Sequence, residues 1–484
     1  MDLKQLAGNR RLLSRATFVA LLSVVVLVNV IINALVTRFS WYLYTEERYE
    51  HTIGTASETV FADVGDEERV RVIFCTSRDA LLADNVRSLV LRTFTQLAER
   101  HAFLSIEFVN IYLNPSAVRD YTKRVTASGE TVTYNLNEDS VILVSDKGFR
   151  VESLQSFFVL DGEGAITAYN GEEIAIAAVS WVLAERHPLV GFTHRHGENF
   201  SDLSAFATLL LAAGYDMTLL DLAEDVPSDV ELIVVANPRW DLDRGAGGII
   251  AELDRLAAFL DRGGHLFVSL DPYAKTDLTG LRAFLEARGL TASQDIIHDA
   301  ESSVTYDGYT LGAFAAPSPL GTAVWDRTGA AASDFAIVSD ASVITCASGN
   351  GWTAAPILVT SPTARTYKNG VLTDAAGSYP VYAVSSRTEG GVTSSVFLTS
   401  SVYLLANDVL NSAVYENRAA VLASLEGAVG KPMPVGCTLL PVGNERLEGL
   451  TMKTARLYAA LLSVAVPLAV IAVGTVITVR RKIR

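Results

Sequence analysis

The sequence predicts an α/β protein with one membrane-spanning helix near each end of the chain. Uncharged apolar runs at 16–36 and 457–479 have the roughly 20 residues that a helix needs to cross a hydrocarbon core. Between them, strand-sized runs that are apolar along their whole length alternate with stretches whose apolar residues recur at helical spacing. This pattern is typical of a parallel sheet covered by helices on both faces.

The first 15 residues predict a cytoplasmic tail, followed by a transmembrane helix over 16–36. Short basic flanks stay on the cytoplasmic side of a membrane. A secretory signal peptide is the alternative, but its apolar region is shorter and ends in a small-residue cleavage site. The exit at 33–37 has no Ala-x-Ala pattern, so we expect an uncleaved anchor. The basic residues of the tail are Lys4, Arg10, Arg11 and Arg15.

Residues 46–185 predict a small α/β sandwich domain. The expected order is strand, helix, strand, strand, helix, and Cys75 falls on the first strand without a Cys-x-x-Cys partner, which favours a buried small residue over a redox site. The expected strands are 69–76, 105–112 and 140–145, and the expected helices are 85–100 and a helix that begins at 171–173.

Residues 187–430 predict a second domain with a flavodoxin-like or Rossmann-like parallel sheet. A stretch at 300–390, rich in Thr, Ser, Gly and Ala, predicts a β-rich insertion from which the chain returns for a last strand and helix. The expected strands are 189–193, 217–222, 232–236, 266–270 and 395–401, and the expected helices are 203–213, 249–260, 278–288 and 418–428.

The second apolar run, 457–479, predicts another transmembrane helix, and the basic residues of 480–484 place its end in the cytoplasm. Pro467 and Gly474 lie inside the run. Lipid-embedded helices tolerate both residues where neighbouring helices re-satisfy the freed backbone groups. We therefore expect a two-pass protein of a bacterial cytoplasmic membrane with both ends inside and the main domain outside.

Charge and cysteine content restrict the function classes. The formal net charge is −15. Because the two basic tails balance to +7, the segment between the anchors carries about −22, which repels nucleic acid and favours solubility. Cys75, Cys346 and Cys437 are odd in number and far apart, so no disulfide framework is predicted.

Polar and titratable residues fall where the predicted parallel strands end, which is where ligands bind in such sheets. Three interpretations are open: metal ligation by a His-x-His-x-Glu run with a nearby Asp, a groove that binds a ligand without metal, and loop side chains that only satisfy helix ends and backbone groups. The candidate residues are His194, His196, Glu198, Asn237, Asp271 and Asp299.

Catalytic and cofactor motifs are absent from the sequence. It contains no Gly-x-x-x-x-Gly-Lys-Ser/Thr loop, no Gly-x-Gly-x-x-Gly after a strand and no Gly-x-Ser-x-Gly elbow. We therefore predict a protein that is not an enzyme and holds no cofactor or metal.

An ordered set of segments resembles the gliding-motility-type auxiliary subunit of bacterial ABC transport systems. Family members often carry Gly-His-Gly-Glu after the first strand, where this chain has Arg195-His196-Gly197-Glu198. The resemblance also includes the closing apolar helix with its basic end. The segments that carry it are 190–198, 211–215, 232–238, 259–266, 270–272 and 416–418.

The resemblance implies a non-enzymatic partner of a transporter, in which other chains supply the ATPase and the permease. The outer domain would contact substrate, an envelope polymer or another protein through a groove around His196, Asn237 and Asp271. The main alternative is a membrane-tethered envelope hydrolase that uses Glu198, Asp271 and Asp299 as acid and base. A third is a structural adhesion or scaffold module.

Overall fold

The computed structural model describes residues 52–442, except for 66, 126–130, 161–162, 243–250, 275, 306, 369, 413 and 438. The predicted membrane spans at 16–36 and 457–479 and both basic tails lie outside the described residues. Among the residues that are described, no helix combines the length and the apolar character needed to cross a membrane. The described chain is a mixed α/β structure with parallel and antiparallel sheets.

The first half of the described chain is built on a four-stranded sheet of order β2-β1-β5-β6. β1 pairs with β2 in parallel, and the other two pairings are antiparallel. The predicted strands and helices of this half are present, but β6 was not predicted because its residues are all half-buried or exposed. The sheet strands are β1 (Val70–Phe74), β2 (Leu104–Phe108), β5 (Ser140–Val144) and β6 (Phe149–Ser153).

Helices and short strands complete this half around one core, in which the aromatic rings of Phe74, Phe94 and Phe157 pack edge to face. The helices are α3 (Ala56–Val60), α4 (Arg78–Leu82), α5 (Arg87–Arg100) and α6 (Gly171–Leu183), with 3-10 turns η2 (Pro115–Tyr121) and η3 (Leu154–Phe157). The short strands are β3 (Lys123–Val125), β4 (Thr131–Thr133), β7 (Phe158–Leu160) and β8 (Ile166–Tyr169).

The second half is organised by a nine-stranded sheet of order β10-β9-β11-β12-β21-β20-β17-β14-β15. Its first five strands are parallel. In chain order they run 2-1-3-4-5, the order of flavodoxin-like sheets. They are β9 (Leu189–Thr193), β10 (Asp216–Leu220), β11 (Val230–Ala236), β12 (His265–Ser269) and β21 (Val392–Thr399).

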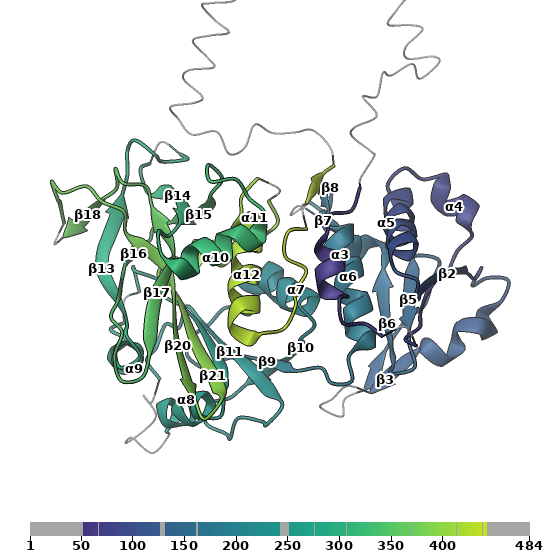
Figure 1. Cartoon of the computed structure of the whole chain (residues 1–484), viewed down its shortest axis with the longest axis horizontal. Helices are drawn as coiled ribbons and strands as arrows, with labels where there is room; N and C mark the ends of the chain where they lie inside the picture. Colours follow the sequence, from purple (N-terminus) through teal and green to yellow (C-terminus); the bar gives the residue numbers. More distant parts are fainter. Residues whose placement is uncertain are drawn as a thin grey trace, which may run out of the picture. The chain divides into compact units, whose positions relative to one another are not determined.

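Helices cover both faces of this sheet (Figure 1). Phe267 of β12 packs into the core under α7 and α12, whereas its neighbours Leu266 and Val268 pack into the core under α8 and α9. This alternation explains why the strands read as continuous apolar runs. The helices are α7 (Ser204–Ala212), α8 (Glu252–Asp261), α9 (Thr279–Glu286), α11 (Asn407–Leu410) and α12 (Asn417–Val429), with 3-10 turns η4 (Phe200–Leu203) and η5 (Val402–Leu405).

The stretch predicted as a β-rich insertion does not stand apart from the main sheet. Its strands β14, β15, β17 and β20 extend that sheet in antiparallel fashion. It also contains a helix that was not predicted, and Ser303 forms a β-bridge with Leu311. The elements are β14 (Thr310–Ala315), α10 (Pro319–Thr328), β15 (Ala336–Ser339), β17 (Thr353–Thr360) and β20 (Pro380–Glu389).

A separate four-stranded antiparallel sheet of order β16-β13-β18-β19 packs beside the main one. Asp299, the sixth candidate site residue, follows a strand of this sheet rather than a strand of the parallel one. Its strands are β13 (Leu290–His298), β16 (Ser342–Cys346), β18 (Arg365–Lys368) and β19 (Val371–Leu372).

The described chain begins and ends in the same hydrophobic core. Ile53 is buried in the core of the first half, and Val442 packs against that core. After α12 the chain returns to this half, where β22 (Leu440–Pro441) pairs with β8 and the Val442 N–H donates to the Thr167 carbonyl. The two ends of the described region are therefore held by one body.

Candidate binding site at the ends of the parallel strands

Five of the six predicted site residues follow neighbouring parallel strands. His194, His196 and Glu198 come after β9, Asn237 after β11 and Asp271 after β12. β11 lies between β9 and β12 in the sheet. The Asn237 N–H donates to the Ser269 carbonyl over 2.8 Å, which ties the ends of β11 and β12 together.

His196 is the centre of a buried cluster of charges. Its Nδ1 lies 3.1 Å from Oε1 of Glu198, and its Nε2 lies 3.1 Å from Oε2 of Glu252, the first residue of α8. The side chains of all three are less than a tenth exposed. Both ring nitrogens face carboxylate oxygens, and both can donate to them when the imidazole is in its charged form.

The electrostatics of the cluster favour this charged state. Burial lowers the pKa of His196, but the hydrogen bonds and negative charges of Glu198 and Glu252 outweigh it and raise that pKa above its ordinary value. Burial raises the pKa of Glu198, but its bonds to His196, to backbone N–H and to the Thr193 hydroxyl bring that pKa below its ordinary value. The surroundings of the cluster therefore favour its ion-paired form.

The turn that carries His196 is conformationally unusual. Arg195 has φ 87° and Gly197 has φ 84°, both in the left-handed region. Glycine adopts that region readily, whereas a residue with a Cβ is strained there. Arg195 therefore stands, with an exposed side chain paired to Asp221 over 2.6 Å, at a position whose backbone favours glycine.

Backbone bonds hold the turn against the next strand end. The His196 carbonyl accepts from the N–H groups of Arg239, at 2.7 Å, and Trp240, at 3.0 Å. Glu198 Oε2 accepts from the N–H of His196 itself, at 2.7 Å. These bonds tie the turn after β9 to the segment that follows β11.

Asp271 and Asp299 have separate local roles. Asp271 accepts from the N–H of Tyr273 over 2.8 Å and closes the turn after β12. Asp299 follows β13 in the other sheet and is buried, and its Oδ2 accepts from the hydroxyls of Ser361 and Thr363. The structure therefore places Asp299 on a different sheet from the other five residues.

A small crevice of about 40 Å³ opens beside the cluster. His194 and Glu198 line it together with apolar groups, among them Phe192, Phe200 and Leu219. A water needs roughly 10 to 15 Å³ of such space, so the crevice accommodates a few waters or the end of a side chain.

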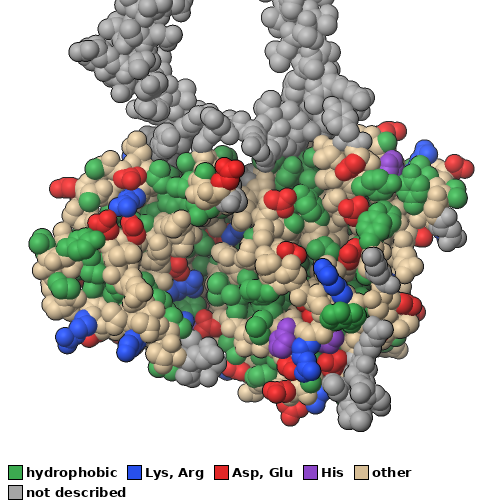
Figure 2. Space-filling view, turned by 180° about the vertical axis from the view of Figure 1, so that it is seen from behind, with side chains coloured by type: hydrophobic (Ala, Val, Ile, Leu, Met, Phe, Trp, Pro, Cys, Tyr) green, Lys and Arg blue, Asp and Glu red, His purple; other side chains and the backbone are tan. Residues whose placement is uncertain are grey.

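The sequence did not lead us to expect the exposed apolar side chains that lie along the edge where the parallel strands end. Leu219 lies near the end of β10, Phe200 follows β9, Trp240 follows β11 and Tyr273 follows β12, and all four are exposed. Figure 2 shows how apolar groups reach the surface among charged side chains on one face of the molecule. For Phe200, Trp240 and Tyr273, the signal in the sequence was the position of a large apolar residue in the loop that follows a buried strand.

Among the described residues, no group of three or more His, Cys, Asp or Glu side chains is placed to hold a metal ion. In the His196 cluster, both imidazole nitrogens face carboxylate oxygens instead.

No protein-family model matches the sequence, and the comparison with curated proteins gives no significant match. Among solved structures, the chain is similar to the mmIFT52 N-terminal domain, with 14% identity, a TM-score of 0.37, and coverage of 50% of this chain and 97% of that one. It is also similar to cytoplasmic protein STM3548 from Salmonella typhimurium, with 12% identity, a TM-score of 0.25, and coverage of 44% and 87%. At these values neither likeness bears on function.

Proposed function

We propose that this chain is a membrane-anchored, non-enzymatic auxiliary subunit of a bacterial ABC transport system. Its body outside the cytoplasmic membrane binds substrate, an envelope polymer or a partner protein. An ATPase subunit and a permease in other chains supply the energy and the pore. The two predicted membrane helices, at 16–36 and 457–479, hold the body at the membrane.

The observation that carries this proposal is the shared core at the two ends of the described region. Ile53 and Val442 pack with the same set of side chains, so both predicted helices connect to one body. About 15 residues separate each of these positions from the nearer apolar run, a length that spans at most about 50 Å when extended. Such short connections suit a body that stays next to the membrane on two anchors.

The edge of the parallel sheet supports a binding role for that body. The cluster around His196 ties the strand ends together. Trp240, whose N–H donates to the His196 carbonyl, and Tyr273, which follows β12, are both exposed at this edge. Aromatic residues on a rigid surface are enriched in protein interfaces and bury large areas at low entropic cost. A partner that contacts this edge therefore meets preorganised apolar groups.

The test is affinity purification of the full-length chain from native membranes in a mild detergent. We expect an ABC-type ATPase subunit to co-purify with the wild-type chain. Recovery of the chain without any ATPase contradicts the transport role and favours an envelope hydrolase or an adhesion or scaffold module.

A double variant, Trp240→Glu with Tyr273→Glu, tests the binding edge separately. We expect it to retain the ATPase subunit and to lose the transporter-dependent phenotype. Leu113→Glu is the control, because it places a carboxylate on an apolar residue of the first half that is also exposed. Equal phenotypes for the double variant and the wild type would remove the strand-end edge from the proposal.

A further inference from the structure

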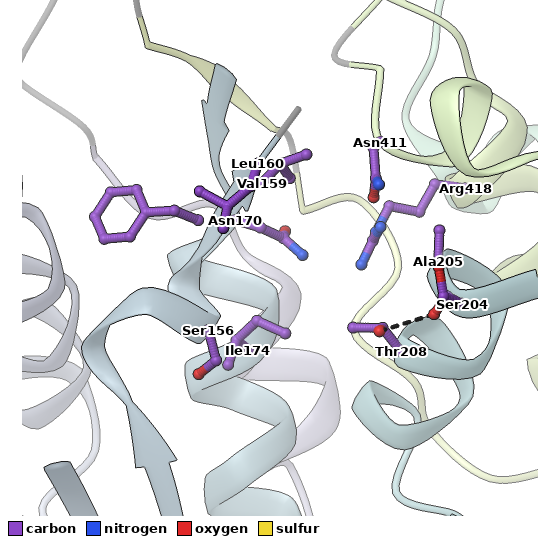
Figure 3. Close-up of a pocket in the computed structure, with 11 residues that line it drawn as sticks. Ser156, Val159, Leu160, Asn170, Ile174, Ser204, Ala205, Thr208, Asn411 and Arg418 are labelled. Carbon is purple, nitrogen blue, oxygen red and sulfur yellow. Dashed lines mark hydrogen bonds between the residues drawn. The ribbon is translucent and has the colours of Figure 1, made fainter. Parts of the chain in front are cut away.

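A cleft of about 160 Å³ lies where the first half of the described chain meets the second. Strand β7 and the start of α6 form one wall, and the starts of α7 and α12 contribute to the other (Figure 3). The residues that line it are all different from those of the His196 cluster. It is a separate site, and its interpretation does not depend on the transport role.

Arg418 brings hydrogen-bond donors into this cleft from a buried position. Its Nε and Nη2 donate to the two carboxylate oxygens of Glu173, both over 2.6 Å, and its Nη1 donates to the Leu410 carbonyl over 3.2 Å. A guanidinium has five N–H groups. Two of them, one on each terminal nitrogen, have no partner among the described residues, and the side chain is only 7% exposed.

Asn170 faces Arg418 from the opposite wall. Its backbone N–H donates to the Phe157 carbonyl. Its side-chain amide has no hydrogen-bond partner within the described part of the chain, although the residue is only 5% exposed. Figure 3 shows this amide and the guanidinium of Arg418 extending toward each other across the cleft. Because it lines the cleft, this amide is available to bond to a group bound there.

The starts of two long helices add to the donor character of the cleft. Asn170 directly precedes α6, and its side chain does not cap that helix. Arg418 lies in the first turn of α12. The N-terminus of a helix favours negative charge, because its first N–H groups are unpaired and its dipole is positive there. Since Glu173 neutralises Arg418, the remaining guanidinium N–H groups and the side-chain amides determine what the cleft prefers.

The remaining walls restrict the size and polarity of a ligand. Asn411, a half-buried residue after α11, adds a second amide, whereas Val159 and Ile174 offer an apolar surface. The cleft is smaller than the roughly 300 to 1,000 Å³ of sites for drug-sized ligands. It therefore suits a molecule of a few atoms with acceptor oxygens at one end and a short apolar group at the other.

We propose that this cleft binds a small organic carboxylate, such as a short hydroxy acid. The carboxylate accepts from Arg418 and from the Asn170 amide, while Asn411 bonds to the hydroxyl. The apolar group of the ligand packs on Val159 and Ile174. No covalent chemistry is involved, and the cleft acts as a binding site.

The test is a ligand-observed NMR titration of the purified full-length chain in mild detergent with L-lactate, and with its neutral isostere L-lactamide. We expect saturable binding of lactate that is at least about tenfold tighter than that of lactamide, because charge-assisted hydrogen bonds are lost in the amide. Asn170→Asp and Asn411→Asp each place a negative charge in the cleft, so each is expected to weaken lactate binding about tenfold or more. Asn114→Asp, in an exposed turn of the first half, is the matched control and leaves binding unchanged.

Three results overturn the proposal: no saturable lactate binding, equal affinities for lactate and lactamide, or unchanged lactate affinity in the cleft variants. Asn411 is only half-buried, so Asn411→Asp decides the matter if Asn170→Asp does not fold. Loss of lactate binding in Asn114→Asp as well would show that the effect is not specific to the cleft and would equally count against the proposal.

Discussion

Replacing His196 by Gln removes the positive charge that lies between two buried carboxylates. Glu198 and Glu252 then face each other across a neutral side chain, with their own side chains less than a tenth exposed. Breaking a buried ion pair by removing one partner typically costs about 3 to 5 kcal/mol. We expect a loss of about 3 kcal/mol in the free energy of unfolding near pH 6, since glutamine keeps one hydrogen bond.

The loss has a predictable dependence on pH. The pKa of His196 is raised in the folded protein, so its stabilising contribution is complete below the unfolded value of about 6.5 and disappears as pH rises through the folded value. The pKa of Glu198 is lowered, so its contribution is lost only as pH falls below about 4.3 toward the folded value. The difference between wild type and variant is therefore largest between about pH 5 and 6.5 and shrinks in alkali.

The assay compares denaturant unfolding of the full-length wild type and variant, followed by tryptophan fluorescence, near pH 6 and in alkali. Only the difference is informative, because burial lowers the pKa of His101, His187 and His265 and makes the total stability fall toward acid. The control is His194→Gln, which leaves both carboxylates of the cluster paired. A difference that is independent of pH, or that grows in alkali, would refute the ion-paired description of the cluster.

The remaining predictions concern the strand-end turn, a buried asparagine and the thiols. Arg195→Gly and Arg195→Ala both lose the pair with Asp221, but only the alanine variant keeps a Cβ at φ 87°. The glycine variant should therefore be more stable than the alanine variant by about 1 kcal/mol in denaturant unfolding. Equal stabilities would argue against backbone strain at this position. Asn417 is fully buried, and its side chain bonds to the N–H and carbonyl of Ile337 and to the carbonyl of Leu404. Asn417→Ala should therefore lower the free energy of unfolding by about 3 kcal/mol or more. A loss below about 1 kcal/mol would contradict these bonds. Burial raises the pKa of Cys75 and of Cys346 to about 11. Near pH 8, both thiols should therefore react with iodoacetamide about a hundredfold more slowly in the folded protein than in the unfolded chain. Rapid labelling of the native protein would contradict this burial.

Much of the second half was predictable because its pattern is local. β9, β11 and β12 are apolar at nearly every position, and a strand buried on both faces needs no distant information to be recognised. The site residues that follow these strands could be placed at one edge for the same reason. Glu252 could not, because it is 56 positions away from His196 and no periodicity links an acidic helix start to that turn.

The elements that the sequence did not predict correctly share a physical explanation: their local pattern does not determine their structure. β13 alternates buried and exposed positions only loosely and carries several polar residues, so its sheet could not be assigned from its sequence. Helix α10 carries ordinary boundary signals, a capping Ser318 and a left-handed Gly329, but the surrounding Thr, Ser, Gly and Ala favoured short strands. The Asn170–Arg418 cleft combines elements that only the folded chain brings together.

The account depends most on where the described body lies relative to the membrane. Its most direct test is limited proteolysis of intact spheroplasts, with epitope tags placed at the two ends of the chain. The account predicts that protease added outside cleaves within 52–442 while both tags stay protected. An uncut body together with accessible tags would contradict it.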